Sequence, residues 1–417
     1  MVTNEKLNNT QKLYIILIYS LPFYTISFAG LSVKDVILLI LLGYYFVLLI
    51  KFDLSFMRDQ LITLLLILLL FLLSIVSLTN APDINTSFRA SISIINIFIL
   101  VFITFNIIKT ECFFFLVIKT IYIMSILVAL LGIIQVISYE LLGINLGGFF
   151  GYPFILQTDI RSTAFFSNPN LYGFFLHFGH SLSLSILILY KGIRIIPYSF
   201  KIILINHFIL LLAIIASGSK GATLSLIIAT LVIFLVVIVK KKMFSILLVT
   251  LALPIALIIF NIREISKSIF QDNGESNTRL DFWEYTLRMF NEKPFLGYGM
   301  DSFREVTSLN TIPHNLYLQT LSENGLLGLL VLIFIFVSSI YFLLFVCLKT
   351  IYNEYFLIST ALFGALIEML VHSISLSAFN NVMLWLCISL IGTNYFVFKK
   401  EGIRIYDKGN DISRSSN

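Results

Sequence analysis

Long uninterrupted apolar runs constrain this chain more than any other feature of its sequence. The stretch LITLLLILLLFLLSIVS at 61–77 contains no charged residue, and similar runs recur along the chain. A helix that spans a bilayer needs about 20 predominantly apolar residues. These runs are continuously apolar and do not alternate as barrel strands do. Because backbone groups in hydrocarbon must be paired within each helix, the sequence predicts an all-α, polytopic integral membrane protein.

The runs predict about twelve transmembrane helices. They are expected near 13–29, 33–50, 61–79, 90–107, 113–138, 165–190, 202–217, 221–239, 243–260, 325–347, 354–373 and 381–398. With the N-terminus in the cytoplasm, eighteen of the 28 Lys and Arg residues fall on the inner side, and four fall in short outer loops or outer span ends. The remaining six lie in one long outer loop, 261–313. This bias predicts that both termini are cytoplasmic.

Composition excludes several other classes of protein. Charged residues make up 12% of the chain and hydrophobic residues 59%, which no soluble fold could bury. The net charge of +6 follows from the inner basic residues, so no nucleic-acid partner is expected. The three cysteines have no regular spacing, which argues against a disulfide framework or a structural zinc site.

The long outer loop contains one helical pattern, SNTRLDFWEYTLRMFNEKP. Ser276 or Asn277 can cap its start, and Pro294 follows its end. Apolar side chains recur on one face at three- and four-residue steps: Leu280, Trp283, Leu287 and Phe290. The pattern predicts a short amphipathic helix that lies on the membrane surface.

Polar motifs gather on the predicted outer side. They are RSTAFFSNPNLYG (161–173), SGSKGA (217–222), TRLDFW (278–283), and KPFLGYGMDSF (293–303) followed by PHNLYLQTLSENGLLG (313–328). Taken alone, SGSKGA is better explained as an ordinary turn, since turns favour Gly and Ser. Together on one side, the motifs favour a single external cavity.

The order of these motifs resembles the O-antigen polymerase and O-antigen ligase superfamily of bacterial inner-membrane glycosyltransferases. The resemblance covers roughly residues 160–335, and its specific part is P-x-L-G-x-G-x-x-S-F followed by H-N-x-x-L-x-x-x-x-E-x-G. One position departs from the pattern, because Lys220 stands where ligases usually have arginine. Lysine keeps the charge but loses the planar fork of the guanidinium, which weakens the ligase assignment.

The resemblance implies a multi-pass enzyme of the bacterial cytoplasmic membrane with its active site facing outward. The first hypothesis is a polymerase that joins undecaprenyl-diphosphate-linked repeat units into O-antigen, capsule or a similar polysaccharide. The alternative is a ligase that transfers the finished glycan to lipid A core, protein or another surface acceptor. A flippase or transporter is a distant third, because no paired repeats or matching broken helices are visible. Implied partners are the lipid-linked glycan, an acceptor glycan, the lipid bilayer, and flippase and chain-length regulator proteins.

The resemblance also implies roles for residues in these motifs. Arg279, Lys220 and Arg161 are candidates to stabilise the departing diphosphate electrostatically; the alternative role for such cations is to anchor lipid head groups. His314 is the candidate general base for the acceptor hydroxyl, or else an interfacial capping residue. Four further residues are candidate substrate contacts: Asn170, Asn315, Glu323 and Tyr298. No metal and no cofactor are expected, and the transfer is expected to invert the anomeric carbon.

Two pairs of ionisable residues fall inside predicted spans. Glu368 and His372 are four residues apart, and either line the same cavity or satisfy one another as a buried pair. His177 and His180 are three apart and are interpreted as polar residues inside the bundle, since two ligands do not make a metal site.

Four regions follow from these patterns. N-terminal transmembrane helices occupy 1–160, and a ligase- or polymerase-like catalytic region, including the external loop, occupies 161–335. C-terminal transmembrane helices occupy 336–398, and 399–417 is expected to be a cytoplasmic tail. Within the catalytic region, 314–324 is expected to be helical, with a break at Gly325 before the next span.

Overall fold

The structure is a computed structural model, and it is almost wholly helical where it is described. The described residues are 7–23, 27–28, 31–48, 58–146, 155–156, 159–189, 198–241, 279–309, 311–350 and 354–414. The helices are α1 (Asn9–Ser20), α2 (Val33–Leu48), α3 (Arg58–Ser77), α4 (Ile84–Ile107), α5 (Glu111–Leu142), α6 (Pro169–Leu189), α7 (Phe200–Ala216), α8 (Lys220–Lys241), α10 (Arg279–Glu292), α11 (Phe303–Thr307), α12 (Leu316–Lys349), α13 (Glu354–His372) and α14 (Val382–Arg414).

Short elements complete the described chain. Two 3-10 turns occupy η1 (Leu21–Phe23) and η3 (Leu78–Asn80). Four two-residue strands form two antiparallel pairs: β1 (Ser27–Phe28) with β2 (Leu31–Ser32), and β3 (Ile155–Leu156) with β4 (Asp159–Ile160).

Eight helices of the described chain are long and apolar enough to cross a bilayer, which confirms a polytopic membrane protein. They are α3, α4, α5, α6, α8, α12, α13 and α14. Three further predicted spans are helical but shorter, with 12 residues in α1, 16 in α2 and 17 in α7. The predicted span at 243–260 lies outside the described residues. The total of about twelve therefore stays a prediction.

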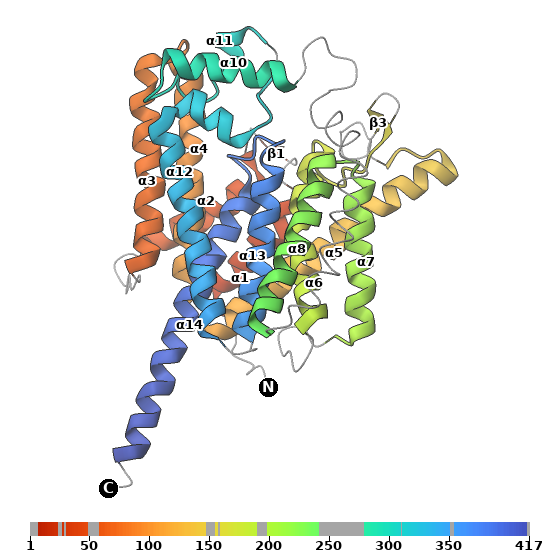
Figure 1. The fold of residues 1–417 in the computed structure, drawn as a ribbon, viewed down its shortest axis with the longest axis vertical. Helices are drawn as coiled ribbons and strands as arrows, with labels where there is room; N and C mark the ends of the chain where they lie inside the picture. The colour runs from red at the N-terminus through yellow and green to blue at the C-terminus, as the bar shows by residue number, and fades with distance from the viewer. Residues whose placement is uncertain are drawn as a thin grey trace.

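The helices form one bundle with distinct ends (Figure 1). The start of α1 and the end of α14 lie toward one end, and the last turns of α14 project beyond the bundle (Figure 1). At the opposite end, α10 and α11 lie across the bundle and pack beside the start of α12. The motif-bearing segments and the chain ends are thus at opposite ends of the molecule.

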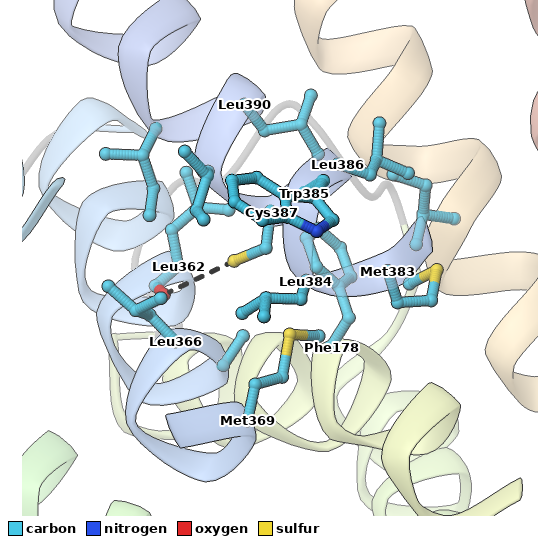
Figure 2. Packing of buried hydrophobic residues seen from close by; sticks show 14 of the residues in the cluster. Phe178, Leu362, Leu366, Met369, Met383, Leu384, Trp385, Leu386, Cys387 and Leu390 are labelled. Carbon is cyan, nitrogen blue, oxygen red and sulfur yellow. Dashed lines mark hydrogen bonds between the residues drawn. The ribbon is translucent and has the colours of Figure 1, made fainter. Parts of the chain in front are cut away.

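The core lies where α6, α13 and α14 meet (Figure 2). Trp385 of α14 is fully buried there, and its indole N–H donates to the Phe379 carbonyl at 2.6 Å. Gly364 lets α13 approach its neighbours closely, since an added Cβ would lie 2.4 Å from Ile233 of α8 and 2.7 Å from Ser181 of α6. Small residues at crossings of this kind allow membrane helices to pack tightly. α13 is therefore held from several sides, and its C-terminal end provides a fixed reference for the site.

Candidate functional site

Arg161 and the turn between α7 and α8 form one unit. Its guanidinium Nε donates to the Ser217 carbonyl at 3.0 Å, and Nη2 donates to Asn170 Oδ1 at 3.4 Å. Gly218 adopts φ +60°, and a Cβ at that position would lie 3.0 Å from the Arg161 side chain. The structure thus brings together Arg161, Asn170 and the SGSKGA turn, which are separated in sequence.

The same turn leads directly into α8, so the N-terminus of this helix lies at the turn. Ser219 Oγ accepts from the Ala222 amide at 3.3 Å, and the Ser219 carbonyl accepts from the Thr223 amide at 3.0 Å. Lys220 is the first residue of the helix, and its side chain is exposed. A helix N-terminus carries partial positive charge and free amide donors. With Arg161 packed on the turn and Lys220 on its rim, this corner is suited to a phosphate group.

His314 lies at a sharp corner just before α12. Its φ of +51° is in the left-handed region, which is uncommon for residues other than glycine. Asn315 caps α12, because its Oδ1 accepts from the amides of Tyr317 and Leu318 at 3.0 Å each. The Leu316 amide donates to the Ser373 carbonyl at 2.9 Å, which ties the corner to the end of α13. Asn315 was predicted to contact substrate or to orient His314; the structure places its carbonyl oxygen in the helix cap.

The KPFLGYGMDSF segment is bonded to α12 through main-chain groups. The amides of Tyr298 and Gly299 donate to the carbonyls of Ser322 and Glu323 at 3.0 and 2.8 Å. In return, the amides of 326 and 327 donate to the carbonyls of 294 and 295 at 2.8 and 3.4 Å. Gly325 interrupts the helix with φ 67° and ψ −172°, which confirms the predicted break and makes this exchange possible.

Glu323 is buried between α12 and the KPFLGYGMDSF segment. Its side chain is only 2% exposed, and its carboxylate accepts from Gln319 Nε2 at 3.2 and 3.3 Å. It also accepts from the backbone amides of Asp301 and Phe303. The structure therefore places this predicted substrate contact against the protein's own backbone.

Tyr298 donates its hydroxyl proton to the Glu292 carboxylate at the end of α10. That hydrogen bond to a negatively charged acceptor raises the pKa of the Tyr298 hydroxyl to about 12. The hydroxyl of Tyr298 is thus hydrogen-bonded within the protein.

The predicted amphipathic helix is confirmed as α10, which starts at Arg279 and ends at Glu292. Phe282, Thr286 and Met289 are buried against the protein. Leu280 and Leu287 of the predicted apolar face are instead 51% and 47% exposed. The helix therefore has a second apolar face that points away from the bundle. The predicted caps, 276 and 277, lie outside the described residues.

The two halves of the site meet at the end of α13. His372 Nε2 lies 3.3 Å from Ser219 Oγ in the turn, and the next residue, Ser373, accepts from Leu316 beside His314. The charge of Arg279 acts on His372 from α10. We call the SGSKGA turn with Arg161 and Lys220 the cationic turn, and residues 314–316 the His314 corner. Two consecutive residues, His372 and Ser373, thus contact the cationic turn and the His314 corner.

A buried cluster of ionisable side chains lies beneath the turn. Glu368 Oε2 lies 2.7 Å from His177 Nδ1, and Glu368 Oε1 lies 2.8 Å from His180 Nδ1. His177 Nε2 lies 3.0 Å from His372 Nδ1, and the Ser181 hydroxyl also donates to Glu368. The sequence spacing showed the two pairs separately, but not that they contact each other and Ser219. Within the described residues, no group of three or more His, Cys, Asp and Glu side chains is arranged to hold a metal ion.

Comparison with known proteins relates part of the chain to a known family. Residues 205–333 match a family model described as O-antigen ligase, and a search of curated proteins finds no match. The matched segment includes Lys220, Arg279, His314 and Glu323. This family implies a membrane enzyme that transfers glycosyl groups from lipid-linked glycans. This match supports a resemblance of residues 205–333 to the O-antigen polymerase and ligase superfamily.

Proposed function

We propose that this protein is a polymerase that joins undecaprenyl-diphosphate-linked repeat units into a surface polysaccharide on the outer face of the cytoplasmic membrane. One observation carries the proposal: His372 and Ser373, at the end of α13, hold the cationic turn and the His314 corner respectively. A transfer of this kind needs an anion site for the leaving diphosphate and a proton acceptor for the attacking hydroxyl. Both lie at the same end of one helix.

The donor half of the reaction falls to the cationic turn. As the glycosidic bond breaks, its electron pair passes to the diphosphate oxygen, which gains negative charge. Arg161, Lys220 and Arg279 bring three cationic side chains to this region, and the N-terminus of α8 adds amide donors. Charges fixed in advance stabilise a developing anion without reorganising at the moment of reaction. Asn170 positions Arg161 through its Oδ1.

The acceptor half falls to His314. Its imidazole takes the proton of the attacking hydroxyl as the bond to the anomeric carbon forms from the side opposite the diphosphate. This single displacement inverts the anomeric carbon and needs no covalent sugar–enzyme intermediate. An imidazole suits this role because its ordinary pKa is about 6.5. Asn315 and Glu323 act as positioning residues, since they fix the start of α12 and the loop that packs on it.

Ligase-type transfer to another acceptor is the second candidate, and the description of the matching family favours it. The two reactions share donor chemistry and differ only in the acceptor. Lys220 keeps the charge of the arginine that ligases usually have but lacks its planar fork, which weighs against the ligase.

The test is to delete the gene and identify the lipid-linked glycans that accumulate. Single repeat units on undecaprenyl diphosphate would support the polymerase. Full-length chains on the same lipid would contradict it in favour of the ligase. An unchanged lipid-linked pool would contradict both functions.

A further inference from the structure

A continuous chain of polar contacts runs from the SGSKGA turn into the bundle. From the turn inward it passes through Ser219, His372, His177 and Glu368, with distances of 3.3, 3.0 and 2.7 Å between successive polar atoms. All four side chains are at most 1% exposed. We refer to these residues as the relay. Four of the chain's five histidines lie in or beside the relay, and His314 is the fifth.

The contacts constrain where the protons sit. His180 Nδ1 is hydrogen-bonded to Glu368 Oε1, and His177 Nδ1 lies 2.7 Å from Glu368 Oε2, so both nitrogens carry hydrogen when the carboxylate is ionised. Between His177 Nε2 and His372 Nδ1 there is room for one hydrogen, which belongs to either ring. An ionised carboxylate buried this deeply is stabilised by a nearby positive charge, which an imidazolium of this cluster would supply.

That positive charge has two positions within the relay. On His177, both ring nitrogens carry hydrogen, and His372 is neutral. If the Nε2 hydrogen of His177 passes to His372 Nδ1, the charge moves to His372, whose Nε2 hydrogen then points at Ser219 Oγ. The ring centroids of the two histidines are 5.2 Å apart, so the charge moves by about that distance toward the turn.

Other groups act on the same charge from each neighbouring helix. From α6, His180 and Ser181 contact Glu368. From α8, Ser225 Oγ lies 3.3 Å from His177 Nε2. Cys387 of α14 interacts electrostatically with Glu368, and Arg279 of α10 interacts electrostatically with His372. His207 of α7 stacks on His180, with ring centroids 5.3 Å apart, and lies at the far end of the cluster.

With no anion at the turn, burial and the charge of Arg279 disfavour a cation on His372, and the carboxylate of Glu368 favours the charge on His177. A diphosphate at the turn reverses this preference, because two or more negative charges then lie near Ser219. We propose that the relay moves one proton from His177 to His372 when a diphosphate occupies the turn. The relay thereby adds a cation to the floor of the site. This inference rests on the proposed function for the location of the diphosphate, but no step of glycosyl transfer is part of it.

The test uses the full-length protein in lipid nanodiscs, labelled with nitrogen-15 at histidine and titrated with inorganic pyrophosphate near pH 7. Five histidines give a spectrum in which imidazole and imidazolium nitrogens can be distinguished. We expect pyrophosphate to change His372 from imidazole to imidazolium and His177 in the opposite direction. Binding without any change in these two residues would overturn the relay and leave the anion site standing. Failure of pyrophosphate to bind would overturn both the anion site and the relay.

Two variants separate charge from positioning. His372→Gln keeps a polar atom near the Nε2 position for Ser219 but cannot accept the proton from His177. Glu368→Gln removes the carboxylate that stabilises the positive charge of this proton on the relay. We expect both to bind pyrophosphate about tenfold more weakly, within the range usual for coupled sites. Ser359→Ala is the control, because it removes a buried polar side chain of α13 whose hydrogen bond is to Asn394, and it should bind as the wild type does. Wild-type affinity in His372→Gln would show that the residue only positions the turn, and would contradict the proposal.

Discussion

Gly325 lies where the first turns of α12 join its longer apolar part. We expect Gly325→Ala to weaken the main-chain contacts between 294–299 and α12. Its φ of 67° and ψ of −172° fall in a region essentially restricted to glycine, where another residue costs about 1–3 kcal/mol. An added Cβ would also lie 2.2 Å from the Phe295 carbonyl oxygen, which is main chain and cannot rotate away. Relieving this clash would break main-chain hydrogen bonds between 294–295 and 326–327, and each broken bond would cost about 1 kcal/mol.

The expected total is about 3 kcal/mol, or roughly a hundredfold increase in local opening. Hydrogen exchange read by mass spectrometry measures this opening directly on the amides of 298–299 and 326–327. Gly143→Ala is the matched control, since Gly143 has nearly the same φ, +66°, but nothing within 4 Å of an added Cβ. It should leave exchange at 298–299 unchanged. If Gly325→Ala exchanged at the wild-type rate there, the steric argument would be refuted.

Three further predictions concern the site and the topology. His314→Ala should keep donor binding but lower turnover of a defined lipid-linked substrate by about 10²–10⁴-fold. His314→Gln should be nearly as slow, because glutamine cannot accept the proton. Full turnover in either variant would exclude general-base catalysis. Arg279→Ala should lose about 2–4 kcal/mol of transition-state stabilisation in kcat/KM, whereas Lys220→Arg should be tolerated; near-normal transfer in Arg279→Ala would mean that the residue only anchors the helix. In intact cells, a cysteine introduced at position 272 should react with an impermeant reagent and one at 241 should not; the reverse pattern would place the motifs on the cytoplasmic side.

Features encoded by local sequence were predictable. The helix at Arg279–Glu292 follows from its apolar spacing and the proline after it, and the break at Gly325 follows from a glycine between two helical patterns. The convergence of the motifs at one end of the bundle followed from counting spans and basic residues. Each of these depends on neighbouring residues or on a rule that acts along the whole chain.

Features that depend on contacts between distant helices were not predictable. Glu368 and His180 are 188 residues apart, and His177 and His372 are 195 apart, so no local pattern could pair them. The two short-range pairs were the available signal, because ionisable residues are expensive in a membrane and tend to meet. The cap made by Asn315 and the backbone contacts of Glu323 were also missed, since each residue type suits substrate binding equally well.

The attachment of 294–299 to α12 has a consequence for how this site could vary in sequence. Its four bonds join amides to carbonyls, and those groups are the same whatever side chains the residues carry. The steric restrictions fall instead on three glycines. A Cβ at Gly297 would lie 2.4 Å from the Glu323 carbonyl carbon, one at Gly325 would meet Phe295, and Gly299 has φ +90° with Ser87 3.0 Å from an added Cβ. Side chains that face outward from this segment can thus be exchanged while the backbone frame stays fixed. The surface at this end of the bundle can therefore change in sequence without a change in the fold.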